Sequence, residues 1–160
     1  MSKEINLTHG KVAIVDEDDY EKLNKYKWSA NELYALRFSR KAGGGKTIFM
    51  HKVILGSPAG MEVDHINRDG FDNRKCNLRI CTHSQNEANK GLRRDNTSGE
   101  KGIYWNKRYG KWHARIRLNN IRIHIGYYDD IKNASDAYQS KAKELFGEFA
   151  EINRIGGVNE

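Results

Sequence analysis

The strictest pattern in this chain of 160 residues is the alternation of apolar and polar side chains over residues 111–128. The segments KWHARIRL and IRIHIGYY both alternate with a period of two, and Asn119 and Asn120 stand between them. This period is typical of half-buried β-strands, and two asparagines suit the positive φ of a type I′ turn. The pattern therefore predicts an antiparallel hairpin with one apolar face and one basic face.

The neighbouring segments complete a predicted module over residues 102–153. IYWNKR is interpreted as a third strand that joins the hairpin through a turn at Tyr109. After the hairpin, Asn133 is predicted to cap a helix that ends at Gly147. Apolar side chains recur on one stripe of this helix: Ala134, Ala137, Tyr138, Ala142 and Leu145. We expect the helix to cover the apolar face of a three-stranded antiparallel sheet, which leaves the basic face bare.

Positive charge is concentrated around this module. The whole chain carries 28 Lys and Arg against 21 Asp and Glu, whereas residues 90–128 alone hold ten basic residues against two acidic ones. Localised positive charge with interleaved aromatic residues is typical of proteins that bind the phosphate backbone of a nucleic acid. A solvated basic face, or a sheet that binds a protein, is the alternative explanation of the same charges.

A second motif lies in VDHINRDGFDNRKCNLRICTHSQNEANK, residues 63–90. Asp64 and His65 are adjacent, Asn77 follows the histidine by 12 positions, and Asn86 follows it by 21. A carboxylate and an amide carbonyl supply the oxygen ligands that a hard divalent cation prefers, and histidine can take a proton from water near neutral pH. These residues are therefore suited to phosphodiester cleavage at one cation. A polar loop without chemistry is the alternative, because Asn, Asp and Gly are ordinary turn residues.

The order Asp-His, Asn-Leu-Arg and Ser-Gln-Asn resembles the HNH nucleases, specifically the phage and intron-borne homing endonucleases with Asn in the third motif position. The resemblance implies that His65 is the general base and that Asp64 and Asn86 bind one Mg²⁺ or Mn²⁺ ion. It also implies that Asn77 fixes the loop of a ββα-metal (His-Me finger) motif. His83, three residues before Asn86, is the alternative residue for the third position.

Residues 102–153 resemble the ethylene-response-factor (Apetala-type) DNA-binding domain, in the form fused to phage homing nucleases. The resemblance rests on GIYWNKRYGKWHARIRLNNIRIHIGYYDD and the helix that follows. It implies that the bare face of the sheet contacts double-stranded DNA in the major groove. The side chains on the matching DNA-facing positions are Tyr104, Asn106, Arg115, Arg117, Arg122 and His124.

The segment 1–56 is expected to form a small α+β subdomain. The runs VAIV and LYALRFSR predict strands, while DEDDYEKLNKY and MHKVILG predict helices. His51 on the second of these helices is interpreted as a packed or surface histidine, although it could approach the active site. The run AGGGKT at 42–47 lacks the first glycine of a phosphate-binding loop, so we interpret it as a hairpin turn and expect no small-molecule cofactor.

Other properties narrow the class of protein. No run approaches the ~18 apolar residues that span a bilayer, and MSKEINLTHGK lacks the apolar core of a secretory signal. Cys76 and Cys81 cannot form the four-cysteine zinc site of some HNH relatives, so no zinc is expected. They also provide no disulfide framework, which favours a cytoplasmic location, in the host cell if the chain is phage-encoded.

The sequence thus predicts an α+β protein that acts as a site-specific, metal-dependent DNA endonuclease and nicks one strand per monomer. A DNA-binding transcription regulator with a non-catalytic HNH motif is the main alternative, and RNA binding or a non-specific colicin-like toxin are weaker ones. The sequence indicates no oligomeric state. The predicted segments are an N-terminal subdomain at 1–56, the nuclease motif at 57–90, a linker at 91–101, the DNA-binding module at 102–153 and a tail at 154–160.

Overall fold

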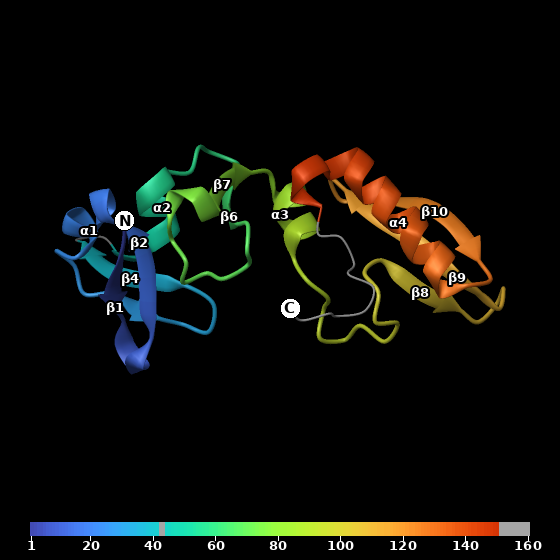
Figure 1. The fold of residues 1–160 in the computed structure, drawn as a ribbon, viewed down its shortest axis with the longest axis horizontal. Coiled ribbons are helices and arrows are strands. Elements are labelled where there is room, and N and C mark those ends of the chain that lie inside the picture. The colour runs from blue at the N-terminus through green and yellow to red at the C-terminus, as the bar shows by residue number, and fades with distance from the viewer. Residues whose placement is uncertain (42–43, 151–160) are drawn as a thin grey trace. The chain divides into compact units, whose positions relative to one another are not determined.

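The computed structural model describes residues 1–41 and 44–150, and its contacts divide the chain into two compact units, Met1–Thr82 and His83–Glu160. Figure 1 shows the order of their elements along the chain. The elements of the first unit are β1 (Ser2–Asn6), β2 (Val12–Asp16), α1 (Glu17–Leu23), β3 (Ser29–Ala30), β4 (Ala35–Lys41), β5 (Gly44–Phe49), α2 (Met50–Leu55), β6 (Glu62–His65) and β7 (Leu78–Cys81).

The strands of the first unit pair in small antiparallel sheets. β1 pairs with β2, β4 lies between β3 and β5, and β6 pairs with β7. The predicted strands and both predicted helices of residues 1–56 are confirmed, as are the two strands that flank the loop of the nuclease motif. Of the hairpin turn predicted at 42–47, residues 42–43 lie outside the described part.

The hairpin partner β1 was not predicted from the sequence. Only Ile5 of this strand is buried, so its sequence SKEIN carries no alternating apolar signal. The neighbouring strand β2 does alternate, with Ala13 and Val15 buried. The core of the unit packs these side chains against helices and loops, and its buried members are Ile5, Leu7, Ala13, Val15, Leu23, Trp28, Ala35 and Met50.

The second unit contains the predicted three-stranded sheet and its helix. Its elements are α3 (His83–Asn89), β8 (Ile103–Asn106), β9 (Lys111–Leu118), β10 (Ile121–Tyr128) and α4 (Ile131–Phe146). The sheet is antiparallel in the order β10-β9-β8, and α4 lies across one face of it (Figure 1). Asn119 and Asn120 both have positive φ, at 48° and 65°, which confirms the predicted hairpin turn. The apolar face and α4 form the core: Ile103, Ala114, Ile116, Ala134, Tyr138, Ala142 and Phe146.

Two details of this unit differ from the sequence prediction. The cap of α4 is Asp130, whose side chain accepts hydrogen bonds from the backbone N–H groups of Lys132 and Asn133, so the prediction that Asn133 is the cap was wrong. In addition, a register shift between His124 and Gly126 interrupts the alternation of β10. The predicted end of the helix is confirmed, because α4 stops before Gly147, which has φ of 53°.

The helix α3 belongs by its contacts to the second unit, and the predicted linker at 91–101 lies inside that unit. The ammonium group of Lys101 donates hydrogen bonds to the carbonyl oxygens of Glu87 and Ala88, at 3.2 and 2.6 Å. This lysine thereby satisfies carbonyls at the end of α3 that have no helical partner. The predicted tail at 154–160 lies outside the described residues. Across residues 1–41 and 44–150, no helix is long and apolar enough to cross a membrane.

Candidate active site and nucleic-acid interface

The loop between β6 and β7 is closed by the side chain of Asn77. Its Oδ1 accepts a hydrogen bond from the backbone N–H of Asn67 at 2.9 Å, and its Nδ2 donates to the carbonyl of Asp72 at 2.7 Å. The carbonyl of Asn77 also accepts from the N–H of Ile66 at 2.8 Å. Asn77 is buried, so these bonds are shielded from water. The asparagine therefore connects the two limbs of the loop that follows His65.

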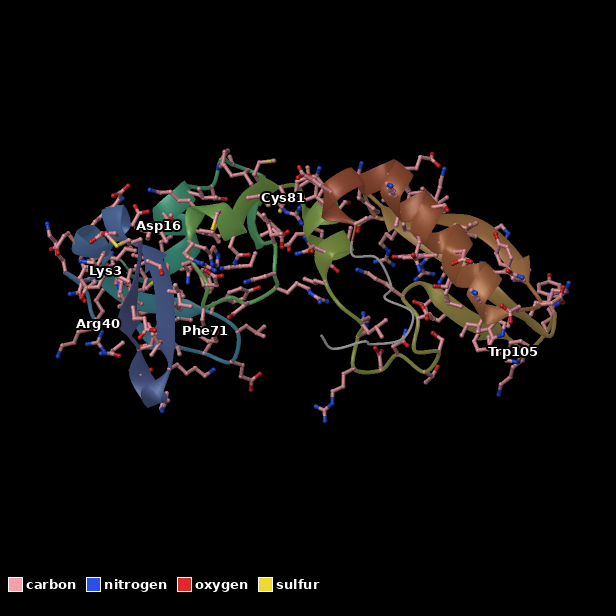
Figure 2. All side chains as sticks on the ribbon, in the orientation of Figure 1. Lys3, Asp16, Arg40, Phe71, Cys81 and Trp105 are labelled. Atoms are coloured by element: carbon pink, nitrogen blue, oxygen red, sulfur yellow. The ribbon has the colours of Figure 1, made fainter. Side chains whose placement is uncertain are left out.

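The far side of this loop is attached to strand β2. The N–H of Ile14 donates to the carbonyl of Phe71, and the N–H of Asn73 donates to the carbonyl of Ile14, at 2.9 and 2.7 Å. Asp16 (labelled in Figure 2) accepts a hydrogen bond from the N–H of Lys75 at 2.7 Å. The N-terminal hairpin thus supports the loop that carries the nuclease motif, a role that the sequence did not reveal for residues 1–56.

The imidazole of His65 is oriented by Asn73, which the sequence analysis did not single out. Asn73 is completely buried, and its Nδ2 donates to the carbonyls of Phe71 and Gly70, at 3.1 and 3.4 Å. These carbonyls accept only, so the Oδ1 of Asn73 is the atom that faces Nε2 of His65, at 3.4 Å. Because Oδ1 cannot donate, Nε2 carries the proton and the Nδ1 of His65 carries the basic lone pair.

Aromatic side chains surround His65. The ring of His51 meets it edge-on with centroids 5.1 Å apart, and the ring of Tyr34 lies 5.8 Å away. Phe49 stacks on the ring of His51, with the ring centroids 5.5 Å apart and an interplanar angle of 16°. His51 was expected to be a packed or surface histidine, with an approach to the active site as the alternative. It is packed, but against the candidate base, and its Nδ1 is buried without a hydrogen-bond partner.

Burial determines the protonation of both histidines. It lowers the pKa of His51 to about 3, with smaller contributions from His65 and Lys52. Burial also lowers the pKa of His65, although the hydrogen bond to Asn73 and the nearby carboxylate of Asp64 oppose that shift. Both imidazoles are therefore neutral at pH 7, which is the state that a general base requires.

The predicted metal ligand Asp64 is buried and paired across the strands with Arg79. Its Oδ2 accepts from Nε and a terminal nitrogen of Arg79, each at 2.9 Å. No cluster of three or more His, Cys, Asp or Glu side chains that could hold a metal occurs among the described residues. Magnesium needs no such cluster, since it is commonly bound by one or two protein oxygens together with water and phosphate. A carboxylate and an amide oxygen fit that chemistry.

The structure brings Asp64, His65 and Asn77 together in the first unit, on β6 and the loop that follows it. The other predicted ligand, Asn86, lies on α3, which belongs to the second unit, and His83 begins the same helix. Asn73 and Arg79 were not predicted as site residues from the sequence, and His51 was interpreted as a packed or surface histidine. Of these residues, Arg79 could have been found from the sequence, because pairing the two predicted strands can place it opposite Asp64.

The predicted DNA-facing residues lie on β8, β9 and β10 of the second unit. Arg115 pairs with His124 across the strands, and Arg117 pairs with Arg122. The guanidinium of Arg115 stacks 4.1 Å above the ring of Tyr104. Asn106 has a structural role as well, since its Oδ1 accepts from the N–H groups of Arg108 and Tyr109 and so closes the β8–β9 turn.

Histidine and tyrosine side chains extend this basic face. The Nε2 of His113 and the Nδ1 of His124 are 2.9 Å apart, and the rings of both contact Tyr127. Burial lowers the pKa of His113, and His124 and Arg115 lower it further. The face therefore combines arginines, which can contact phosphates and base edges, with aromatic rings and neutral imidazole.

Comparison with known proteins identifies the nuclease motif. A family model of HNH endonucleases matches residues 54–88. "Uncharacterized HNH endonuclease L560" of Acanthamoeba polyphaga mimivirus is 30% identical over 157 residues, which cover 91% of this chain and 76% of the relative. The chain belongs to the HNH endonuclease family. A second relative of this HNH chain, "Protein 3.8" of Escherichia phage T7, is 28% identical over 93 residues, 58% of this chain and 76% of the relative.

The family model covers only the nuclease part of this HNH endonuclease. The matched segment 54–88 contains β6, β7 and most of α3, and with them Asp64, His65, Asn77 and Asn86. Neither the family description nor the names of the two relatives mention an ethylene-response-factor domain. No solved structure matches the chain significantly. The resemblance of the second unit to that DNA-binding domain therefore depends on its residues and on its sheet and helix.

Proposed function

We propose that this HNH endonuclease is a homing-type enzyme that cleaves double-stranded DNA at a specific site, with His65 as the general base. The observation that carries the proposal is the neutral, buried imidazole of His65, held by Asn73 beside the carboxylate of Asp64. In the proposed reaction, Nδ1 of His65 takes a proton from water as the water oxygen attacks phosphorus and the bond to the leaving oxygen breaks. Asn77 keeps the loop, and with it the base, in place.

The proposed ligands of one Mg²⁺ or Mn²⁺ ion are Asp64 and Asn86. A cation bound there would neutralise charge on the cleaved phosphate and on the leaving oxygen. The role of Asp64 is supported by its position next to His65 and by its carboxylate oxygens, which are ligands that magnesium prefers. In this structure that carboxylate is paired with Arg79. The role of Asn86 is supported by its spacing from His65 and by its presence in the segment that matches the family.

The proposed DNA-binding face is formed by Tyr104, Asn106, Arg115, Arg117, Arg122 and His124. It is supported by the exposure of Arg117 and Arg122, which lie opposite each other on neighbouring strands, and by the position of α4, which covers the other face of the sheet. With one nuclease motif in each chain, the expected product of one binding event is a nick. An exposed sheet face with paired arginines suits the phosphates and base edges of a duplex.

The test is incubation of the protein with supercoiled plasmid and with phage genomic DNA, in Mg²⁺ or Mn²⁺ and again in EDTA. Wild-type protein should nick DNA only with the metal, and strand-resolved mapping of the ends should show a defined site. The variant His65→Ala should bind DNA as wild type does but not cut it. Cleavage by this variant would reject His65 as the base. Binding without cleavage by the wild type would instead favour the transcription regulator with a non-catalytic motif.

A further inference from the structure

The first unit contains a groove that the catalytic loop does not use. It has a volume of about 700 Å³, and its lining comes from β4, β5, α2 and the loop after α2. The polar side chains along it are hydroxyls and ammonium groups, from Ser39, Thr47, Ser57, Lys46 and Lys52. Among the residues that the structure describes, no aspartate or glutamate contributes to the lining. The rest of the lining is apolar or glycine: Gly44, Ile48, Phe49, Val53, Pro58 and Met61. The charge of the groove is therefore positive, and its polar groups are mainly hydrogen-bond donors.

The two lysines of the groove are available to a ligand. Lys46 and Lys52 are both exposed, and the side-chain ammonium group of neither makes an ion pair or a hydrogen bond with any residue in 1–41 or 44–150. Two other lysines of the same unit are ion-paired, Lys3 with Glu17 and Lys75 with Asp19. An ammonium group without an acidic neighbour retains its full attraction for a phosphate.

The groove adjoins the surroundings of the candidate base. Phe49 lines the groove and stacks on His51, and the ring of His51 meets the ring of His65 at 5.1 Å. All three residues belong to the first unit, so their relation does not depend on the second unit. The rings of Phe49 and His51 therefore connect the groove to the imidazole of His65, which is proposed to activate water.

We infer that this groove binds the phosphate backbone of duplex DNA next to the phosphate that is cut, with Lys46 and Lys52 as its cations. The inference rests on the proposed function and adds to it a DNA contact in the unit that carries the base. The occupant follows from charge, since the lining offers two cations, several hydroxyls and no acid to a polyanion. Such a contact would hold the cleaved strand at the first unit whatever sequence the arginine face prefers.

The inference is tested by the salt dependence of DNA affinity. Full-length Lys46→Ala, Lys52→Ala and the double variant are compared with wild type on a mixed-sequence DNA duplex, in EDTA and over a series of NaCl concentrations. Each lysine–phosphate contact releases counterions, so each single variant should reduce the slope of log affinity against log salt by roughly 0.9, and the double variant by roughly 1.8. The matched control is Lys25→Ala, an exposed lysine of the same unit that does not line the groove. Its slope should equal that of wild type.

Unchanged slopes in the groove variants, or an equal loss in Lys25→Ala, would overturn the inference. Equal thermal unfolding midpoints would show that the variants are folded. Plasmid nicking is also measured with the same wild-type preparation in Mg²⁺. This measurement tests the proposed endonuclease function independently of the groove. Nicking together with unchanged slopes rejects the groove and keeps the endonuclease. Reduced slopes without nicking support the groove as a DNA site and reject the hydrolase.

Discussion

Asn73 determines which nitrogen of His65 carries the proton. Its amide hydrogens are directed at the carbonyls of Gly70 and Phe71, and this leaves only its oxygen for the imidazole. Gly70 is required for this arrangement, because a Cβ there would lie 1.9 Å from the carbonyl oxygen of Leu33. The geometry of one buried amide therefore depends on close packing between the loop and the segment before β4.

The variant Asn73→Ala should lower the rate of DNA nicking by about 10- to 100-fold, because His65 loses the partner that selects its basic nitrogen. DNA affinity should not change, since Asn73 is completely buried. Single-turnover nicking and a gel-shift titration measure the two quantities, below the unfolding midpoint of the variant. The control Asn24→Ala alters an exposed asparagine just after α1 and should behave as wild type. A normal nicking rate in folded Asn73→Ala would reject this positioning role.

His51 should make the stability of the first unit dependent on pH. Its pKa is about 3 in the folded chain and 6.5 ordinarily, so unfolding is accompanied by proton uptake between these values. The free energy of unfolding should therefore fall as the pH decreases below 6.5, by about 2 kcal/mol from this residue between pH 7 and pH 5. In His51→Phe that contribution disappears. Urea denaturation of both proteins at the two pH values measures it, and an identical pH dependence would contradict the assigned pKa.

Some residues of the candidate site could be recognised from a local motif in the sequence, and others could not. Asp64, His65 and Asn77 could be selected from adjacency and fixed spacing within one motif. Asn73 could not, because nothing in a loop rich in Asn and Asp distinguishes an amide that becomes fully buried. His51 lies on a separate helix, and its contact with His65 results from the packing of α2 near β6, which local patterns do not encode.

The start of α4 shows how two candidate caps compete. Both Asp130 and Asn133 suit an N-cap, and the cap is Asp130 rather than the predicted Asn133. In the structure the Oδ1 of Asp130 accepts from the N–H groups of Lys132 and Asn133, at 2.7 and 3.1 Å. Ile131 then becomes the first helical residue and packs against the core of the unit. Burial of this apolar residue favours the earlier start.

The variant Asp130→Ala should therefore destabilise the second unit by about 1 kcal/mol, as expected for the loss of an N-cap. The matched variant Asn133→Ala should change the free energy of unfolding by no more than about 0.5 kcal/mol, because this residue is exposed and lies inside the helix. Urea denaturation followed by circular dichroism measures both changes. The reverse order of the two effects would restore Asn133 as the cap.

Strand β10 shows where alternation stops being informative. The period of two correctly predicted an antiparallel hairpin, in which Arg117 lies opposite Arg122, but the register shift after His124 places Tyr127 opposite His113. Tyr127 then packs on the histidines of the basic face, with its ring centroid 4.7 Å from that of His113. Elements with a strong hydrophobic period were thus predicted well. The bulge in β10 and the polar strand β1 were not predicted, because they depend on tertiary contacts that leave no pattern in the local sequence.

The residues with proposed roles are distributed over the two units of the chain. The proposed general base and its supporting loop lie in the first unit, whereas the arginine face and the proposed metal ligand Asn86 lie in the second. The region of greatest positive charge in the sequence, residues 90–128, falls wholly within the second unit. If the proposed function is correct, cutting and DNA recognition should be separable by substitution in the intact chain.

The variant Arg117→Ala should weaken DNA binding and reduce the salt slope by about 1, since an exposed arginine is removed from the proposed DNA-binding face. At protein concentrations that saturate the DNA, it should nick at close to the wild-type rate, because His65 and its partners are unchanged. The control Lys143→Ala removes one charge from α4, on the covered side of the sheet, and should keep wild-type affinity. Fluorescence anisotropy over a salt series and nicking at saturation measure the two effects. Unchanged affinity of Arg117→Ala at physiological salt would remove the sheet as the DNA-binding face, and a rate that stays low at saturation would show that recognition and cutting are not separable.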